Sequence, residues 1–161
     1  MKVRSPELSL QFAYYPSPIG LVELSTTETA LVTLYFVEEP RHASSSSPLL
    51  ATVIQQVHEY FNGTRTRFDL PLDFQGTPFQ RQVWQQLLTV PYGQTFSYQE
   101  IANALGNSKA VRAVGAANGQ NPISIIAPCH RIIGSNGSLI GYGGGLWRKE
   151  WLLKHEGYLL T

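Results

Sequence analysis

The sequence changes character near residue 75, and this change constrains the fold more than any other feature. Before this point, three short segments are rich in β-branched and aromatic residues: 10–15, 20–27 and 30–37. Prolines and a glycine separate the first two segments, so the pattern predicts a small antiparallel sheet. After this point, apolar residues recur mostly at helical spacing. We therefore predict an α+β fold with two domains, residues 1–75 and residues 76–161.

One helix is predicted in the N-terminal domain. Residues 40–48 contain four consecutive serines between prolines, which predicts a surface loop. Residues 49–63 place apolar side chains on one face and reach Gly63, so they predict a helix that this glycine stops. The segment 64–76 then links the two domains.

Two helices of the C-terminal domain are predicted from the residues at their ends. Thr77 as N-cap and Pro78 at the first helical position predict a helix that Pro91 ends. The segment 148–157 is amphipathic, and Gly157 predicts where its helix stops.

Between these helices, the sequence has the outline of a helix-turn-helix. Ser97 and Glu100 form a capping box at the start of a short helix, 98–105. A Gly-Asn-Ser turn follows, and Ser108 is expected to cap a second helix, 109–119. A short helix, a tight turn with glycine and a second helix make up this motif. We therefore expect a mostly helical, winged-helix-like C-terminal domain. The same outline is common in helical bundles, so the residues alone leave open whether this pair of helices binds DNA.

The second helix of this pair is composed mainly of alanine and glycine. Lys109, Arg112 and Asn118 are its residues with useful polar reach. A helix that reads base edges needs several such side chains, so this one cannot specify a DNA sequence. Small residues would let its backbone lie close to a narrow groove with one long cation projecting. Close packing between helices also favours small residues, and the residues alone leave both interpretations open.

Charge and hydropathy limit the possible partners. Residues 1–75 carry five Lys or Arg and eight Asp or Glu, whereas residues 76–161 carry seven and three. A basic C-terminal half favours a polyanionic partner. No apolar run approaches the ~20 residues that a membrane span needs. The first residues also lack the apolar stretch of a signal peptide, so we expect a cytoplasmic protein that does not bind membranes.

Cys129 is the single cysteine of the chain, which excludes an internal disulfide, a dithiol redox cycle and a multi-thiolate zinc site. The four histidines have no spacing typical of metal ligands. We therefore expect no metal and no cofactor.

Cys129 is either a small core residue or a nucleophile. A free thiol has a pKa of about 8.5 and needs a base or a positive charge to react near neutral pH. His130 is adjacent in sequence, and a turn favoured by Pro128 could bring the two side chains together. A base also works best when a third group orients it. Glu156 is the candidate by elimination, because Glu100 caps a helix and the remaining acid of this half lies in a charged run. The residues alone leave both interpretations open.

A longer pattern surrounds this cysteine. Its motifs are Pro-Cys-His-Arg-Ile at 128–132, NPI at 121–123, RAVGAANG at 112–119, GTPFQRQVW at 76–84, SYQEIA at 97–102, GYGGG at 141–145 and KEWLLKHEG at 149–157. In this order they resemble the O6-alkylguanine-DNA alkyltransferases, also called methylated-DNA–protein-cysteine methyltransferases. The resemblance covers residues 76–161 almost without interruption and the N-terminal half only in outline.

The resemblance implies a role for each matching residue around the cysteine. Cys129 would accept the alkyl group, His130 would act as its base through a bridging water, and Glu156 would orient His130. With this support, the pKa of Cys129 would be lowered. Asn121 would brace the turn that precedes the cysteine. Tyr98 would bind the flipped guanine and help neutralise the leaving base.

The resemblance also implies residues of the guanine pocket and of the DNA contact. Tyr142, with neighbouring glycines such as Gly143, would line the pocket. Arg112 would enter the base stack from the minor groove. The remaining DNA-contacting positions would be Lys109, Ala110, Val111, Ala113 and Gly115. Val111 is bulkier than the alanine often found at its position in the family.

The implied activity is irreversible transfer of the alkyl group from O6-alkylguanine in double-stranded DNA to Cys129. DNA would be bound through its minor groove without sequence specificity, and the protein would act as a monomer. O4-alkylthymine stays open as a second substrate. Because the product is a thioether and no second cysteine can resolve it, each chain should react once. The competing hypotheses are a cysteine hydrolase with many turnovers and a nonenzymatic lesion-binding module.

Overall fold

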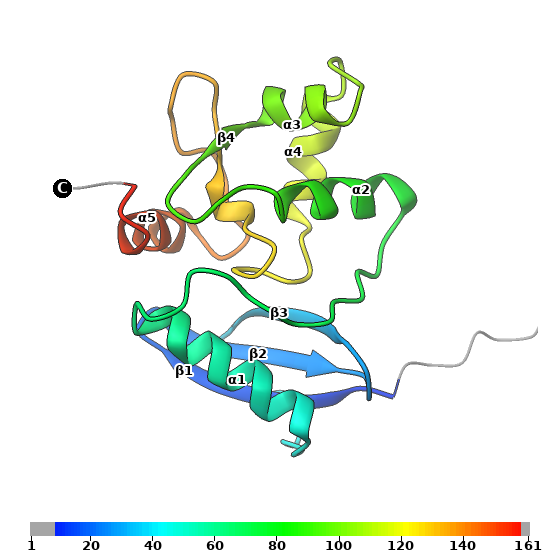
Figure 1. Ribbon diagram of the computed structural model, residues 1–161, viewed down its shortest axis with the longest axis vertical. Coiled ribbons are helices and arrows are strands. Elements are labelled where there is room, and N and C mark those ends of the chain that lie inside the picture. The colour runs from blue at the N-terminus through cyan, green and yellow to red at the C-terminus, as the bar shows by residue number, and fades with distance from the viewer. Residues whose placement is uncertain (1–8, 159–161) are drawn as a thin grey trace, which may run out of the picture.

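The structure, a computed structural model, describes residues 9–158. Its N-terminal part is an antiparallel sheet in the order β1-β2-β3, with helix α1 across one face (Figure 1). The strands are β1 (Gln11–Ser17), β2 (Gly20–Thr26) and β3 (Leu31–Val37). The predicted sheet is therefore confirmed, with each strand within two residues of its predicted segment.

Helix α1 (Pro48–Phe61) begins one residue before the predicted helix, because Ser47 is its N-cap and accepts a hydrogen bond from the backbone of Leu50. It ends before Gly63, whose φ of +78° is readily adopted by glycine. Its buried face includes Val53 and Val57, which belong to the apolar core beneath the sheet. The predicted helix is confirmed.

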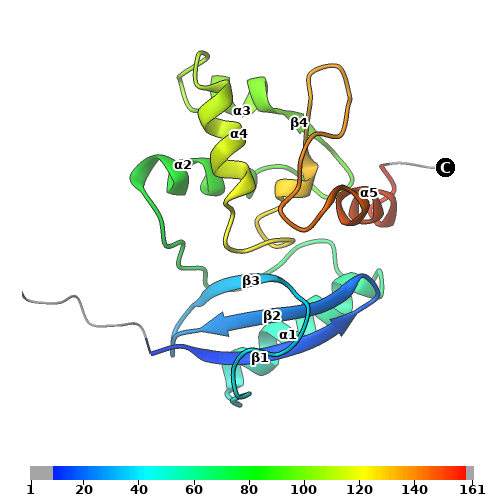
Figure 2. The same ribbon diagram turned by 180° about the vertical axis from the view of Figure 1, so that it is seen from behind.

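The N-terminal and C-terminal parts lie next to each other and share one apolar core (Figures 1 and 2). The elements of the C-terminal part follow in chain order. They are α2 (Pro78–Leu87), β4 (Phe96–Ser97), α3 (Tyr98–Ala104), α4 (Val111–Gly119), the 3-10 turn η1 (Cys129–Arg131), β5 (Ile132–Ile133) and α5 (Leu146–His155). Strands β4 and β5 pair in parallel. The α+β fold class and the two predicted helices of the helix-turn-helix are confirmed. The division at residues 1–75 and 76–161 stays a prediction.

The two predicted N-caps before α2 and α3 are confirmed. The Thr77 side chain accepts a hydrogen bond from the Gln80 backbone N–H, and the Thr77 backbone N–H donates to the Gln80 side chain. Ser97 and Glu100 are paired in the same way. These reciprocal bonds satisfy backbone donors that the first helical turn leaves free. Local sequence is enough to form them, which explains why they could be predicted.

The predicted start of α4 is wrong. Ser108 does not cap this helix, which begins at Val111 with Ala110 as a cap that makes no side-chain hydrogen bond. The backbone N–H of Ala110 instead donates to the carbonyl of Asn107 over 3.0 Å. This bond closes a turn over residues 107–110, so Ser108 and Lys109 lie within the turn that precedes the helix.

The edge strand β3 positions the segment that leads to Cys129. The backbone N–H of Leu34 donates to the carbonyl of Pro122 over 2.9 Å, and Ser124 donates back to Leu34 over 2.8 Å. A strand edge of the N-terminal part is therefore paired with the C-terminal part. Within residues 9–158, no helix is both long enough and apolar enough to cross a membrane.

Candidate active site

Cys129 begins the 3-10 turn η1 and is 4% exposed. The turn that was expected after Pro128 is present. A contact from α4 holds this turn, because the side chain of Asn118 donates to the carbonyl of Cys129 over 3.3 Å. The cysteine thus has a fixed backbone at the junction of η1 and α4.

The side chain of Asn121 organises the loop before the cysteine. It donates to the carbonyls of Ala127 over 2.8 Å and Ile123 over 3.3 Å, and it accepts from the backbone of Ile123 over 3.0 Å. Within this loop Ile125 has a φ of +72°, which is strained for a β-branched residue. These contacts fit the bracing role expected of Asn121.

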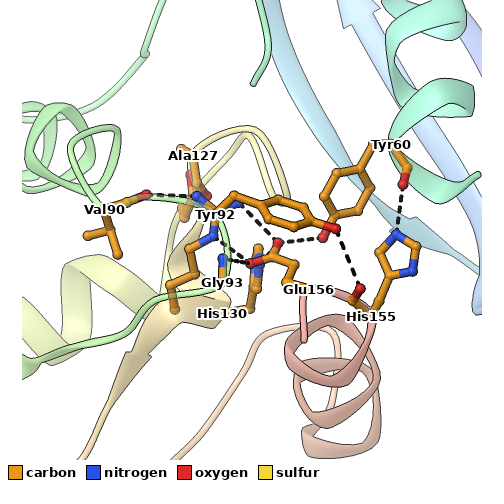
Figure 3. A network of polar contacts seen from close by, with 10 residues as sticks. Tyr60, Val90, Tyr92, Gly93, Ala127, His130, His155 and Glu156 are labelled. Atoms are coloured by element: carbon orange, nitrogen blue, oxygen red, sulfur yellow. Dashed lines mark hydrogen bonds and ion pairs between the residues drawn. The ribbon is translucent and has the colours of Figure 1, made fainter. Parts of the chain in front are cut away.

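Four residues donate hydrogen bonds to the carboxylate of Glu156, directly after α5 (Figure 3). His130 donates from Nε2 to Oε2 over 2.7 Å, and the Tyr60 hydroxyl donates to the same oxygen over 2.6 Å. Arg131 reaches both oxygens, with 2.8 Å from Nε to Oε1 and 3.0 Å from Nη2 to Oε2. The backbone N–H of Gly93 lies 3.3 Å from Oε1. Together they fix the orientation of this buried carboxylate.

Glu156 determines which nitrogen of His130 carries the proton. Burial alone would raise the pKa of Glu156, but the hydrogen bonds from His130 and Arg131, together with the charge of Arg131, outweigh burial and hold this pKa well below its ordinary value. A carboxylate accepts hydrogen bonds only, so Nε2 of His130 carries the hydrogen and Nδ1 keeps a lone pair.

The free nitrogen of His130 is a candidate base. Nδ1 is buried, and nothing among residues 9–158 forms a hydrogen bond with it. Burial lowers the pKa of His130 below its ordinary value of 6.5, although the hydrogen bond and charge of Glu156 partly oppose this. His130 is therefore neutral near pH 7 and can accept a proton at Nδ1.

The expected lowering of the Cys129 pKa is wrong for the resting protein. Burial raises this pKa above its ordinary value, and Asn121, Lys149 and Tyr142 oppose the increase only in part. The apolar surroundings disfavour a thiolate more strongly than these neighbours stabilise it. Cys129 is therefore a protonated thiol at rest and needs a base when it reacts.

A cavity of about 320 Å³ opens beside the two helices of the helix-turn-helix. Its lining residues are Tyr98, Val111, Gly115, Asn118, Gly119, Ile140, Gly141 and Tyr142. Tyr98 and Tyr142, which the resemblance implies for the guanine pocket, both line this cavity. Gly143 lies instead on a neighbouring groove of about 310 Å³, beside Phe36 of the N-terminal part. Val111 and Gly115 line the cavity itself.

The predicted DNA-contacting residues are divided between a turn and a helix. Lys109 and Ala110 precede α4, whereas Arg112 and Ala113 are exposed on it. The opposite face of α4 packs inward, where Trp84 on α2 donates from Nε1 to the carbonyl of Ala117 over 2.8 Å. The small residues of this helix therefore serve close helix packing on one face and leave Arg112 projecting on the other.

Lys149 is a residue of this site that the sequence analysis missed. Its side chain is fully buried, and Nζ donates to the carbonyls of Ile132, Ile140 and Gly141 over 2.6, 3.0 and 3.3 Å. Burial lowers its pKa to about 8. The hydroxyl of Tyr98 donates to the same Ile140 carbonyl over 3.0 Å. Lys149 and Tyr98 therefore both bind the loop that lines this cavity.

A signal for Lys149 was present in the sequence. Lys149, Leu152, Leu153 and Glu156 recur at helical spacing and are all buried, so they share one face of the last helix. The charged neighbours of Lys149 concealed this pattern. Tyr60 had no comparable signal, because it is separated from Glu156 by 96 positions.

The match to known families covers nearly the whole chain. Residues 78–158 match the family described as 6-O-methylguanine DNA methyltransferase, DNA binding domain, and residues 10–74 match the ribonuclease-like domain of the same description. A methylated-DNA–protein-cysteine methyltransferase of Mycolicibacterium paratuberculosis is 46% identical over 152 residues, which are 91% of this chain and 92% of that protein. The chain belongs to the 6-O-methylguanine DNA methyltransferase family. The resemblance inferred from the motifs around Cys129 is thereby confirmed.

Further relatives of this methyltransferase family agree in sequence and in structure. A Shigella flexneri protein of the same name is 58% identical over 106 residues, 65% of this chain and 62% of that protein. The crystal structure of Mycobacterium tuberculosis O6-methylguanine methyltransferase superposes with a TM-score of 0.83 at 44% identity, covering 91% of this chain and 92% of that chain. Mycobacterium tuberculosis OGT in complex with DNA gives 0.84 at 46% identity, with the same coverage.

Proposed function

We propose that this protein repairs DNA by transferring the alkyl group of O6-alkylguanine irreversibly to Cys129. The observation that carries the proposal is the combination of one buried thiol with a histidine whose free nitrogen is buried and whose other nitrogen is held by Glu156. A metal or cofactor is not needed for this chemistry, because a thiol and a base supply both the nucleophile and the proton acceptor.

The cavity supports the transfer of a group from a flipped base. An alkyl group inside a duplex cannot be reached by a buried thiol, so the nucleotide has to leave the stack at a cost of a few kcal/mol. The cavity of about 320 Å³ lies at the lower end of the size range of small-molecule sites, which begins near 300 Å³. Its aromatic walls, Tyr98 and Tyr142, can hold a planar base.

Proton transfer begins at the thiol. Nδ1 of His130 takes the Cys129 proton through a bridging water, while Nε2 keeps its hydrogen bond to Glu156. The sulfur then attacks the alkyl carbon and forms a C–S bond as the bond between that carbon and O6 breaks. The electron pair of the broken bond stays on the guanine. Because the thiol is neutral at rest, its proton has to be removed as the reaction proceeds.

Tyr98 is the candidate donor to the departing guanine. Its hydroxyl currently donates to the Ile140 carbonyl over 3.0 Å, and a hydroxyl has one hydrogen to donate. Donation to the guanine therefore requires the hydroxyl to leave Ile140. Lys149 also binds the Ile140 carbonyl, so this carbonyl stays paired when Tyr98 turns toward the base.

DNA is a partner that the family supports directly, since a relative has been crystallised in complex with it. We propose that α4 approaches the minor groove and that Arg112 occupies the position of the flipped base. The exposed face of α4 has small side chains around Arg112, which favours contact with the backbone over readout of base edges. Binding without sequence specificity by a monomer follows, with Lys109, Ala110, Val111, Ala113 and Gly115 near the DNA.

The decisive experiment is intact-mass spectrometry after mixing with a duplex that contains O6-methylguanine. We expect one added methyl group per chain, on Cys129, and an end to activity after one equivalent of lesion. Cys129→Ser is the matched control and should stay unmodified. Repeated turnover with an unmodified thiol would indicate the hydrolase, and binding without any mass change would indicate a lesion-binding module.

A further inference from the structure

The N-terminal part of the chain reaches the candidate active site through the side chain of Tyr60. This residue lies in the last turn of α1 and is fully buried. Figure 3 shows its ring directed at the carboxylate of Glu156. The hydroxyl donates to Oε2 over 2.6 Å, and Nε2 of His130 donates to the same oxygen over 2.7 Å. Oε2 of Glu156 therefore accepts one hydrogen bond from the N-terminal part and one from the C-terminal part of the molecule.

The position of the Tyr60 hydroxyl is fixed from both ends of the residue. Its backbone carbonyl accepts a hydrogen bond from Nε2 of His155 over 2.7 Å, at the end of α5. Its ring packs edge-on against Tyr92, whose hydroxyl contacts the carbonyl of His155 over 3.4 Å. The last turn of α1 and the end of α5 thus form one rigid junction around Glu156.

The hydroxyl of Tyr60 acts only as a hydrogen donor. Burial and the charge of Glu156 raise the pKa of Tyr60 well above its ordinary value of 10.0, so the hydroxyl keeps its proton. Arg131 and Tyr92 are the other titratable groups that act on it. Each donor on Oε2 neutralises part of its negative charge, so the bond from Tyr60 weakens the pull of Glu156 on the Nε2 hydrogen of His130.

Other charges act on His130 in addition to Glu156. Arg131 in the same turn and Lys149 on α5 are both positive and disfavour the imidazolium, whereas Cys129, the preceding residue in the chain, is a neutral thiol. Of these groups, Glu156 alone favours a protonated imidazole. How readily His130 is protonated therefore depends on the negative charge left on Oε2 of Glu156. The hydrogen bond from Tyr60 reduces this charge.

We propose that Tyr60 is a positioning residue of the alkyl transfer, which holds the Glu156 carboxylate and keeps His130 neutral and able to accept the thiol proton. This role rests on the proposed function. It gives the N-terminal part a direct contribution to the chemistry, made across the boundary between the two parts of the fold.

The first test is Tyr60→Phe, which removes one hydroxyl and keeps the ring. Transfer is measured with a free O6-alkylguanine nucleoside, so that DNA binding does not enter. We expect the maximal rate to fall about 10-fold and the half-saturating concentration to stay the same. The acid limb of the pH–rate profile should move upward by about one pH unit, because Glu156 then stabilises a charged His130 more strongly. Loss of packing alone would lower the melting temperature without moving this limb.

Tyr15→Phe is the matched control. Its hydroxyl contacts Nδ1 of exposed His58 over 3.0 Å, whereas the Tyr60 hydroxyl donates to Glu156. The rate and the acid limb should stay as in the wild-type protein. If Tyr60→Phe fails to fold, 3-fluorotyrosine at position 60 replaces it. Fluorination makes the hydroxyl a stronger donor, so the acid limb should move downward.

Two readouts separate the possible failures. An NMR titration of ¹⁵N-histidine-labelled protein gives the pKa of His130 without any transfer, and it should rise in Tyr60→Phe. Absence of transfer in the wild-type protein would overturn the proposed function and this role with it. Wild-type transfer, with the acid limb and the His130 titration unchanged in the Tyr60 variants, would overturn the role of Tyr60 alone.

Discussion

A single carboxylate, Glu156, determines the state of three other side chains at this site. It fixes the hydrogen of His130 on Nε2, it pairs with the buried guanidinium of Arg131, and it accepts the hydroxyl of Tyr60. A buried charge that loses its partner is far more costly than an exposed one. Substitution of this residue therefore tests the whole network.

Glu156→Gln should lower the free energy of unfolding by about 3–5 kcal/mol, because Arg131 becomes an uncompensated buried charge. Urea unfolding at pH 7 measures this change. Glu150→Gln is the control, since Glu150 pairs with Lys154 on an exposed face over 2.9 Å and should contribute less than about 1 kcal/mol. Equal effects of the two substitutions would contradict the network.

The same variant should lose part of the acid sensitivity of the protein. The pKa of Glu156 is lower in the folded protein than its ordinary value of 4.5, so the unfolded chain binds the proton at a higher pH. The stability that ionised Glu156 contributes is complete above about pH 4.5 and is lost as the pH falls through the lowered pKa. Unfolding followed between pH 7 and pH 3 should show a shallower decline in Glu156→Gln than in wild type. Parallel declines would refute this assignment.

At the scale of elements, the exposed face of α4 tests the interaction with DNA. Arg112→Ala should slow the reaction with a duplex substrate about 10-fold, which corresponds to about 1.4 kcal/mol, because no side chain then occupies the position of the flipped base. Reaction with a free O6-alkylguanine nucleoside should be nearly unchanged. Rates with both substrates, measured by loss of free thiol, check the prediction. Unchanged repair of the duplex would exclude this role for Arg112.

The loop that lines the cavity at residues 140–142 is bound to α5 through Lys149. Lys149→Met keeps an unbranched side chain that is slightly shorter, and it removes three hydrogen bonds to backbone carbonyls. We expect a loss of about 2–3 kcal/mol in unfolding free energy, because hydrogen bonds from charged groups contribute about 1.5–3 kcal/mol each and part is regained by apolar packing. Faster hydrogen exchange of amides 139–142 should accompany it. Lys154→Met, on the exposed face, is the control and should leave these amides unaffected.

At the scale of the whole molecule, the reaction should weaken its own fold. Cys129 is 4% exposed and belongs to the core shared by both parts. A methyl group added there overpacks the core, at a cost of about 1–3 kcal/mol. Each kcal/mol lowers the melting temperature by about 2–4 °C in a chain of this size.

Differential scanning fluorimetry before and after reaction, with the DNA removed, measures this difference. A larger alkyl group should give a larger decrease than methyl. An unchanged melting temperature after complete alkylation would mean that the cavity accommodates the product without strain.

Features that depend on near neighbours in the chain could be predicted from the amino-acid sequence. Strand segments, helix faces and the caps at Thr77 and Ser97 follow from contacts within a few residues. The motifs around Cys129 were enough to place the chain in its family. Ser108 was misassigned because the backbone N–H of Ala110 bonds to the carbonyl of Asn107 and closes a turn that contains Ser108, which local capping rules do not anticipate.

Which distant groups meet, and how their chemistry changes, depends on the packing of the whole chain. Tyr60 and Glu156 are 96 positions apart, and packing of α1 against α5 brings them together. Burial raises the pKa of Cys129 although basic residues are adjacent in sequence, and it places Lys149 inside a helix face that its charge had suggested was exposed. Desolvation depends on all atoms around a group, whichever part of the chain supplies them. For this reason the nucleophile could be identified from the sequence, whereas its protonation state and its supporting residues could not.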